Sequence, residues 1–68
     1  MEIKMRNHSF EYDENEKPTA ALIYLSGENG REHFNSCMVI TNEDVELAKT
    51  PLHQIKSLAV AKLRQAIN

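Results

Sequence analysis

The fold is decided by residues 20–41, AALIYLSGENGREHFNSCMVIT, in which two apolar segments flank a turn. The first segment, residues 20–25, is apolar at odd and even positions alike, which is typical of a central strand covered on both faces. Asn29-Gly30 is the strongest short hairpin signal, because both residues tolerate a positive φ. We therefore predict an antiparallel pair of strands at about 19–26 and 31–41.

A further strand is predicted at about 2–12, where apolar residues alternate with polar ones. The alternation changes phase, from Ile3 and Met5 at odd positions to Phe10 and Tyr12 at even ones. Such a change is typical of a β-bulge, which we place near residues 6–8. The polar run 13–18 ends in proline and indicates a turn. Two consecutive hairpins then give a meander with the second strand in the middle.

The C-terminal residues indicate a helix. Thr41 followed by acidic residues predicts a short helical turn at about 42–48, and Thr50-Pro51 has the residue types of an N-cap and N1 pair. A helix at about 51–67 is indicated by apolar residues at helical spacing: Leu52, Ile55, Ala59, Leu63 and Ala66. The predicted fold is α+β, a three-stranded antiparallel β-meander with one C-terminal α-helix packed on one face, in a single domain of residues 1–68.

Sixty-eight residues lie near the lower limit for a chain that buries its own core. A core of this size rarely contributes more than about 3–5 kcal/mol of net stability, so small domains often add a disulfide, a metal or a subunit interface. A disulfide within the chain is excluded, because Cys37 is the single cysteine. We therefore expect oligomerisation, most simply a homodimer.

Composition places the chain among ordinary globular domains, with 41% hydrophobic and 26% charged residues. It contains no apolar run near the ~18–20 residues that span a membrane, and its first residues do not resemble a signal peptide. Together with one unpaired cysteine, these features predict a cytoplasmic protein with no membrane partner.

Residues that could carry chemistry show no catalytic or metal-binding spacing. The soft metal ligands are His8, His33, His53 and Cys37, and no pair has zinc-site spacing. Gly27 and Gly30 lack the G-K-[ST] sequence of a phosphate loop and are interpreted as turn residues. We expect no enzymatic activity and no cofactor.

One helix covers only one face of a sheet, yet the strands supply apolar residues to both faces. Ala21, Ile23, Leu25, Cys37 and Val39 are grouped on one face by parity, and the other group is Leu22, Tyr24, Phe34, Met38 and Ile40. Parity does not show which group the helix covers. An uncovered apolar patch marks an interface. We therefore predict a protein-interaction module, a homodimer or a binder of another protein, with the second group as the interface.

The alternative function is nucleic-acid binding through the helix. Residues 1–50 contain five bases and ten acids, a net charge of −5, whereas residues 51–68 contain Lys56, Lys62 and Arg64 and no acid, a net charge of +3. These three residues are the candidate phosphate contacts. The strands hold few bases and the whole chain is acidic, so the interaction module is the favoured interpretation. Lys56 and Lys62 then flank the apolar stripe and pair with acids of the sheet.

From Glu2 to Asn68, the order of elements resembles small uncharacterised proteins encoded in phages and prophages of Gram-positive bacteria. The features that carry the resemblance are the Ile3-x-Met5 start, Tyr12-Asp13-Glu14-Asn15 at the first turn, a second short hairpin, Thr41 with acids, and a terminal Leu-rich helix. A longer third segment and an acid-free helix depart from the pattern. The resemblance implies a dispensable accessory or assembly protein and supplies no catalytic residues.

Overall fold

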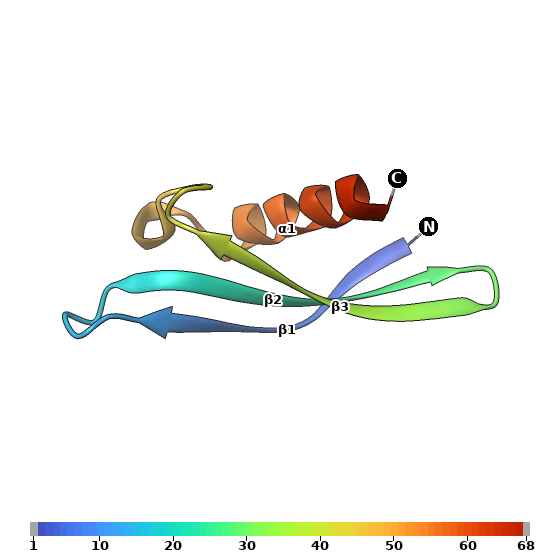
Figure 1. Ribbon diagram of the computed structural model, residues 1–68, viewed down its shortest axis with the longest axis horizontal. Helices are drawn as coiled ribbons and strands as arrows, with labels where there is room; N and C mark the ends of the chain where they lie inside the picture. Colours follow the sequence, from blue (N-terminus) through green and yellow to red (C-terminus); the bar gives the residue numbers. More distant parts are fainter. Residues whose placement is uncertain (1, 68) are drawn as a thin grey trace.

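One helix lies on one face of an elongated antiparallel sheet in the computed structural model, which describes residues 2–67 (Figure 1). The strands are β1 (Glu2–Tyr12), β2 (Pro18–Asn29) and β3 (Glu32–Thr41), with β2 in the centre. A 3₁₀ turn, η1 (Leu47–Lys49), precedes the helix α1 (Leu52–Ile67). The predicted α+β meander with a C-terminal helix is confirmed.

The side chain of Asp13 orders the first hairpin. Its Oδ1 accepts hydrogen bonds from the backbone N–H groups of Asn15 (2.8 Å) and Lys17 (3.0 Å). Aspartate favours turns because its short side chain can bond to nearby backbone in this way. The loop also holds Glu16 at a φ of 62°. The polar run 13–17 is therefore a hydrogen-bonded turn between β1 and β2.

β1 contains the predicted bulge. The pairing register with β2 shifts between Met5 and Asn7, so that Arg6 is the extra residue. Met5 pairs with Leu25 and Phe10 with Ala21, and all four residues belong to or pack against the core. The bulge thus lets odd residues before it and even residues after it face the same way.

The second hairpin turns at Gly30-Arg31, one residue later than the predicted Asn29-Gly30 pair. Asn29 is the last residue of β2 and pairs with Glu32, and Gly30 has a φ of +67°. A glycine at the first of two loop positions is characteristic of a type II′ turn. Because the loop has two residues, every pair between β2 and β3 joins an odd residue to an even one.

Gly27 is a buried residue of β2, and its interpretation as a turn residue was wrong. It lies opposite Phe34 of β3. A Cβ built at Gly27 would lie 2.3 Å from Cε1 and Cζ of the Phe34 ring. The ring therefore covers the glycine backbone, an arrangement in which an aromatic cross-strand neighbour shields the backbone of a strand glycine.

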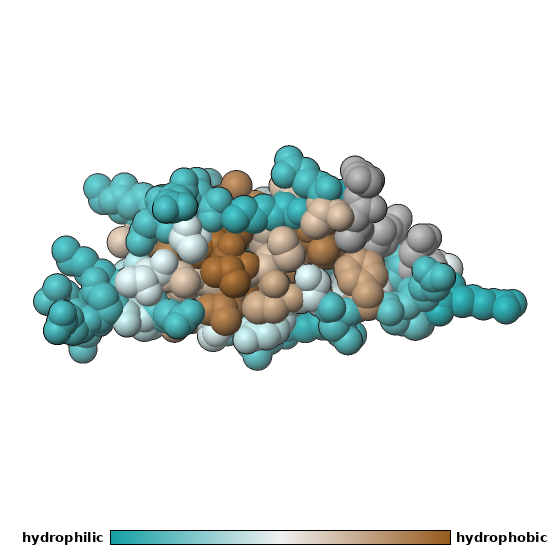
Figure 2. Space-filling model, in the orientation of Figure 1, coloured by the Kyte–Doolittle hydropathy of each residue, from teal (hydrophilic) through white to brown (hydrophobic). Residues whose placement is uncertain are grey.

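The core lies between α1, η1 and one face of the sheet. Its buried side chains are Ala21, Ile23, Leu25, Ile40, Leu47, Ile55, Ala59 and Leu63. The three helical members are spaced four residues apart and form one stripe along α1, because residues i and i+4 share a helix face. Figure 2 shows hydrophobic residues gathered along the middle of the molecule, with hydrophilic residues at both ends of its long axis.

The connection from β3 to α1 differs from the predicted helical turn at 42–48. Residues 42–45 form hydrogen-bonded turns, and the helical turn is the shorter η1. Thr50 is not the cap of α1, because its hydroxyl donates to the backbone oxygen of Glu46 (2.7 Å). The carbonyl of Pro51 instead accepts from the N–H of Ile55 (3.2 Å), which puts the proline at the N-cap position.

Replacing Gly27 by Ala is expected to lower the free energy of unfolding by about 1–3 kcal/mol, because the new methyl group displaces the Phe34 ring. Chemical denaturation of the two single variants and the double variant Gly27→Ala, Phe34→Ala measures the coupling. The cost of Gly27→Ala should disappear in the Phe34→Ala background. An equal cost in both backgrounds would show that the ring contact is unimportant.

Candidate functional site

The sheet face opposite α1 carries a small apolar patch at its centre. Leu22 pairs with Val39, and Tyr24 pairs with Cys37. Val39 is 47% exposed and Tyr24 38% exposed, Cys37 is exposed, and Leu22 is half-buried. We call Leu22, Tyr24, Cys37 and Val39 the open-face patch. Apolar side chains this exposed, next to one another on a sheet, are typical of a surface that contacts another molecule.

Polar residues of β1 border the patch on one side. Ser9 pairs with Leu22, and Asn7 pairs with Tyr24. Strand residues that pair directly point to the same face. The patch therefore lies on β2 and β3, while the third of the face that β1 contributes is polar.

The predicted interface residues are divided between the two faces. Leu22 and Tyr24 lie on the open face as expected, but Ile40 is buried beneath α1, and Phe34 and Met38 pack against the core. Grouping all five on one face was wrong, because the two-residue loop pairs odd with even residues. On the open face of β3 lie Cys37 and Val39, where Met38 and Ile40 were predicted. The predicted Asn29-Gly30 turn already implied a two-residue loop and hence pairs of odd with even residues, which was the signal for this exchange.

The bulge places Arg6 beside the open-face patch. Arg6 lines a shallow hollow of about 380 Å³ together with Tyr24, Asn35 and Cys37. A cationic side chain can pack against an aromatic ring, and Tyr24 lines the same hollow as Arg6. No hydrogen bond or ion pair of Arg6 is found among the described residues. The patch is thus apolar in the middle and bordered by one basic and several neutral polar side chains.

The three basic helix residues do not share one surface. Lys62 lies on the β3 side of α1, where its Nζ is 3.0 Å from Asp44 Oδ1 and donates to the backbone oxygen of Val39 (3.4 Å). Lys56 borders a hollow with Ile3 of β1, on the other side of the helix. Arg64 is exposed. Lys62 therefore pairs with an acid as predicted, but that acid belongs to the connection after β3 and not to the sheet, and no ion pair of Lys56 is found among residues 2–67.

Asp44 holds the end of β3 and the helix together. Its Oδ2 accepts the backbone N–H of Thr41 (2.9 Å), while the Thr41 hydroxyl accepts the N–H of Glu43 (3.3 Å). The N–H group of Thr41 and then the ammonium of Lys62 lower the pKa of Asp44 below its ordinary value. Both interactions favour the carboxylate form.

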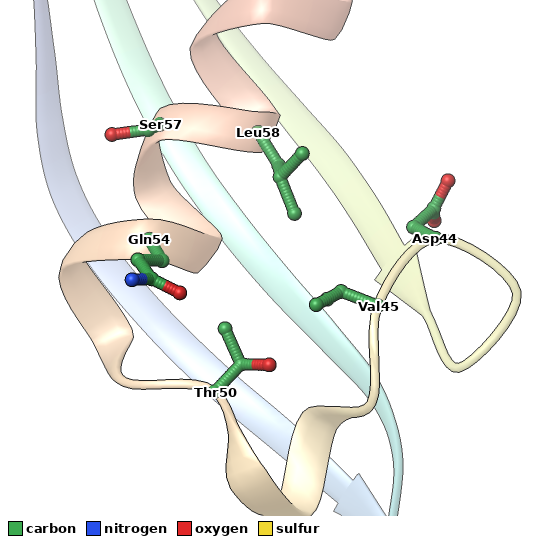
Figure 3. A pocket seen from close by; sticks show the side chains of 6 residues that line it. All are labelled: Asp44, Val45, Thr50, Gln54, Ser57 and Leu58. Carbon is green, nitrogen blue, oxygen red and sulfur yellow. The ribbon is translucent and has the colours of Figure 1, made fainter.

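A second hollow, of about 390 Å³, lies between α1 and the connection that precedes it (Figure 3). Leu58 of α1 and Val45 of the connection point toward one another, and Gln54 and Thr50 line the other side. The Ser57 hydroxyl points away from Val45 and donates to the backbone oxygen of His53 (3.0 Å). No set of polar groups converges on this hollow among the described residues.

No metal site is assembled by the described part of the chain. Among residues 2–67, no group of three or more His, Cys, Asp or Glu side chains could hold a metal ion. His33 Nδ1 lies 3.4 Å from Glu28 Oε1, and His8 packs edge-to-face on Phe10. Cys37 lies on the open face, away from both arrangements.

No protein-family model, no curated protein and no solved structure matches the chain. Among residues 2–67, no helix combines the length and the apolar character that crossing a bilayer requires.

Stability should depend on the charge of Asp44. Its pKa is lowered on folding, so its contribution is fully present above the ordinary aspartate pKa of about 3.9 and is lost as pH falls through the lowered value. Denaturation curves between pH 7 and pH 2 should show a smaller acid-induced loss for Asp44→Asn than for the parent chain. Glu14→Gln, in the exposed first turn, is the control and should leave the pH profile unchanged. An unchanged profile for Asp44→Asn would contradict the role of the Thr41 and Lys62 contacts.

Proposed function

We propose that the protein is a non-enzymatic protein-interaction module that forms a homodimer through the open face of its sheet. The observation that carries this proposal is the open-face patch, in which Tyr24 and Val39 stay 38% and 47% exposed while α1 covers the opposite face. Burying such side chains against a second copy removes apolar surface from water, which is the main favourable term in association.

The size of the face supports a second copy as the occupant. The molecule measures 45 × 17 × 17 Å, so its open face has a projected area of at most about 770 Å². A standard stable interface buries about 800 Å² on each partner. A dimer that used nearly the whole face would therefore fall just below the usual size, and it would add the stabilisation that a 68-residue core lacks.

Both edges of the sheet are less suited to pairing than its face. The bulge at Arg6 interrupts β1, and the ammonium group of Lys62 donates a hydrogen bond to the backbone oxygen of Val39 in β3. Bulges and lysines are two devices by which native sheets discourage pairing at an edge. These features favour packing of face on face over extension of the sheet by another strand.

The biological setting is also a proposal. The order of elements and the turn signals that resemble small phage and prophage proteins support an accessory or assembly role. The single unpaired cysteine, Cys37, supports a reducing compartment and hence the cytoplasm. The mechanism in either setting is apolar burial with polar contacts at the rim, and it involves no bond making or breaking.

Nucleic-acid binding has weaker support. Lys62 is paired with Asp44, and Lys56 lies on the opposite flank of α1. A protein that binds phosphates presents its bases on one surface, and its affinity falls as salt rises. A fluorescence-anisotropy titration with a labelled oligonucleotide at low salt distinguishes the two functions, since salt-sensitive binding lost in Lys56→Ala or Arg64→Ala would favour the helix.

Replacing Val39 by Lys should abolish dimer formation and leave the fold intact, because the new charge is desolvated only in the dimer. Sedimentation velocity over a wide concentration range measures association, and circular dichroism with chemical denaturation measures folding. Gln65→Lys, on the exposed side of α1, is the charge-matched control and should dimerise.

Met38→Lys tests the assignment of the two faces. Met38 packs against the core, so this variant should unfold or lose several kcal/mol of stability, whereas its neighbour Val39→Lys should not. A parent chain that stays monomeric at every concentration, or a Val39→Lys variant that still dimerises, would overturn the proposed function.

A further inference from the structure

The two ends of the molecule differ in charge. The first hairpin and the connection after β3 lie at the same end of the long axis, where the Asn42 side chain donates to the backbone oxygen of Pro18 (3.1 Å) (Figure 1). Seven carboxylates and three lysines lie at this end, which gives it a net charge of −4. The lysines are Lys17, Lys49 and Lys62, the last of which pairs with Asp44. The carboxylates are Glu11, Asp13, Glu14, Glu16, Glu43, Asp44 and Glu46. We call it the acidic end.

The sheet is neutral at its opposite end. There the start of β1 pairs with the end of β2, next to the Gly30-Arg31 loop. Three bases balance three acids, so the net charge is zero, and the residues are Lys4, Arg6, Arg31, Glu2, Glu28 and Glu32. A dimer that placed like ends together would bring two acidic ends of −4 into contact. A dimer with the ends exchanged would place each acidic end against the neutral end of the second copy, which holds Lys4, Arg6 and Arg31 together with three acids.

The position of the open-face patch favours the same choice independently. When two sheets stack with their strands aligned, a two-fold axis between the faces runs either along the strands or across them. An axis along the strands, centred on β2, lays the polar Asn7 and Ser9 of β1 over Val39 and Cys37 of the second copy. An axis across the strands lays β2 and β3 over β2 and β3, so that each patch covers the other.

Given the proposed homodimer, on which this arrangement rests, we propose that the two copies stack face to face with their ends exchanged. The axis crosses the strands between the Leu22–Val39 and Tyr24–Cys37 pairs, so Tyr24 of one copy lies over Leu22 and Val39 of the other. Glu11 then lies opposite Lys4 of the second copy, and the first turn lies opposite its Arg31. Sheets that pack in this aligned way keep their strand directions within about 30° of each other.

Cross-linking between the two hairpin tips tests this arrangement. Asn15→Cys marks the first tip and Glu32→Cys the second, each in a Cys37→Ala background that removes the native thiol. If sedimentation velocity shows that Cys37→Ala does not dimerise, Cys37→Val replaces it. One of the two cysteine variants carries a tag that increases its mass, and the two are mixed and treated with a short bismaleimide. Cross-linked pairs of different variants and cross-linked pairs of the same variant then run as separate bands on a gel. The same proteins carrying Val39→Lys are the control for random collision.

The expected result is a cross-link between Asn15→Cys of one copy and Glu32→Cys of the other, with no cross-link between two copies of the same variant. Like tips would be separated by nearly the full 45 Å length of the molecule. Cross-links between like tips, or a dimer that yields no cross-link above the control, would overturn the arrangement and leave the homodimer in place. A chain that is monomeric by sedimentation would overturn the homodimer and the arrangement together.

Discussion

The register between β2 and β3 is the constraint on which the rest of the structure depends. The Gly30-Arg31 loop pairs Asn29 with Glu32, and every later pair follows from that one. It places Ile23 beside Met38 beneath the helix and Leu22 beside Val39 on the open face. A loop with one residue more or fewer would exchange the faces of one strand relative to the other, because side chains alternate along a strand. The partition of apolar residues between core and surface is therefore set at the hairpin.

The helix completes the covered face and closes one edge. Ile55, Ala59 and Leu63 form the buried stripe of α1, while Lys62 beside that stripe reaches Asp44 and the carbonyl of Val39. One residue of the helix thus satisfies an acid of the connection and blocks part of the β3 edge. The basic character of the helix, which suggested contacts with nucleic acid, is partly used inside the molecule.

Function follows from what remains uncovered. The open-face patch is a cluster of apolar side chains that α1 does not cover, and Tyr12 at the end of β1 is a further exposed aromatic side chain. In the proposed homodimer, the uneven placement of the patch on β2 and β3, together with the charge at one end, would restrict how the second copy approaches. Surface composition would then set orientation as well as affinity, because like charges brought together oppose one arrangement and leave the other favourable.

The element order, the bulge near Arg6 and the stripe of α1 could all be predicted from the sequence, since alternation, helical spacing and turn residues are local signals. The sequence also predicted that one apolar face would lack a cover. The tertiary structure alone decided which residues form that face, placing Cys37 and Val39 there in place of Phe34, Met38 and Ile40. It also decided that Lys62 pairs with Asp44, and that Gly27 lies beneath a ring. These contacts depend on the register and on the docking of the helix, and a change of one residue in the length of a loop reverses a face without altering the local pattern of either strand.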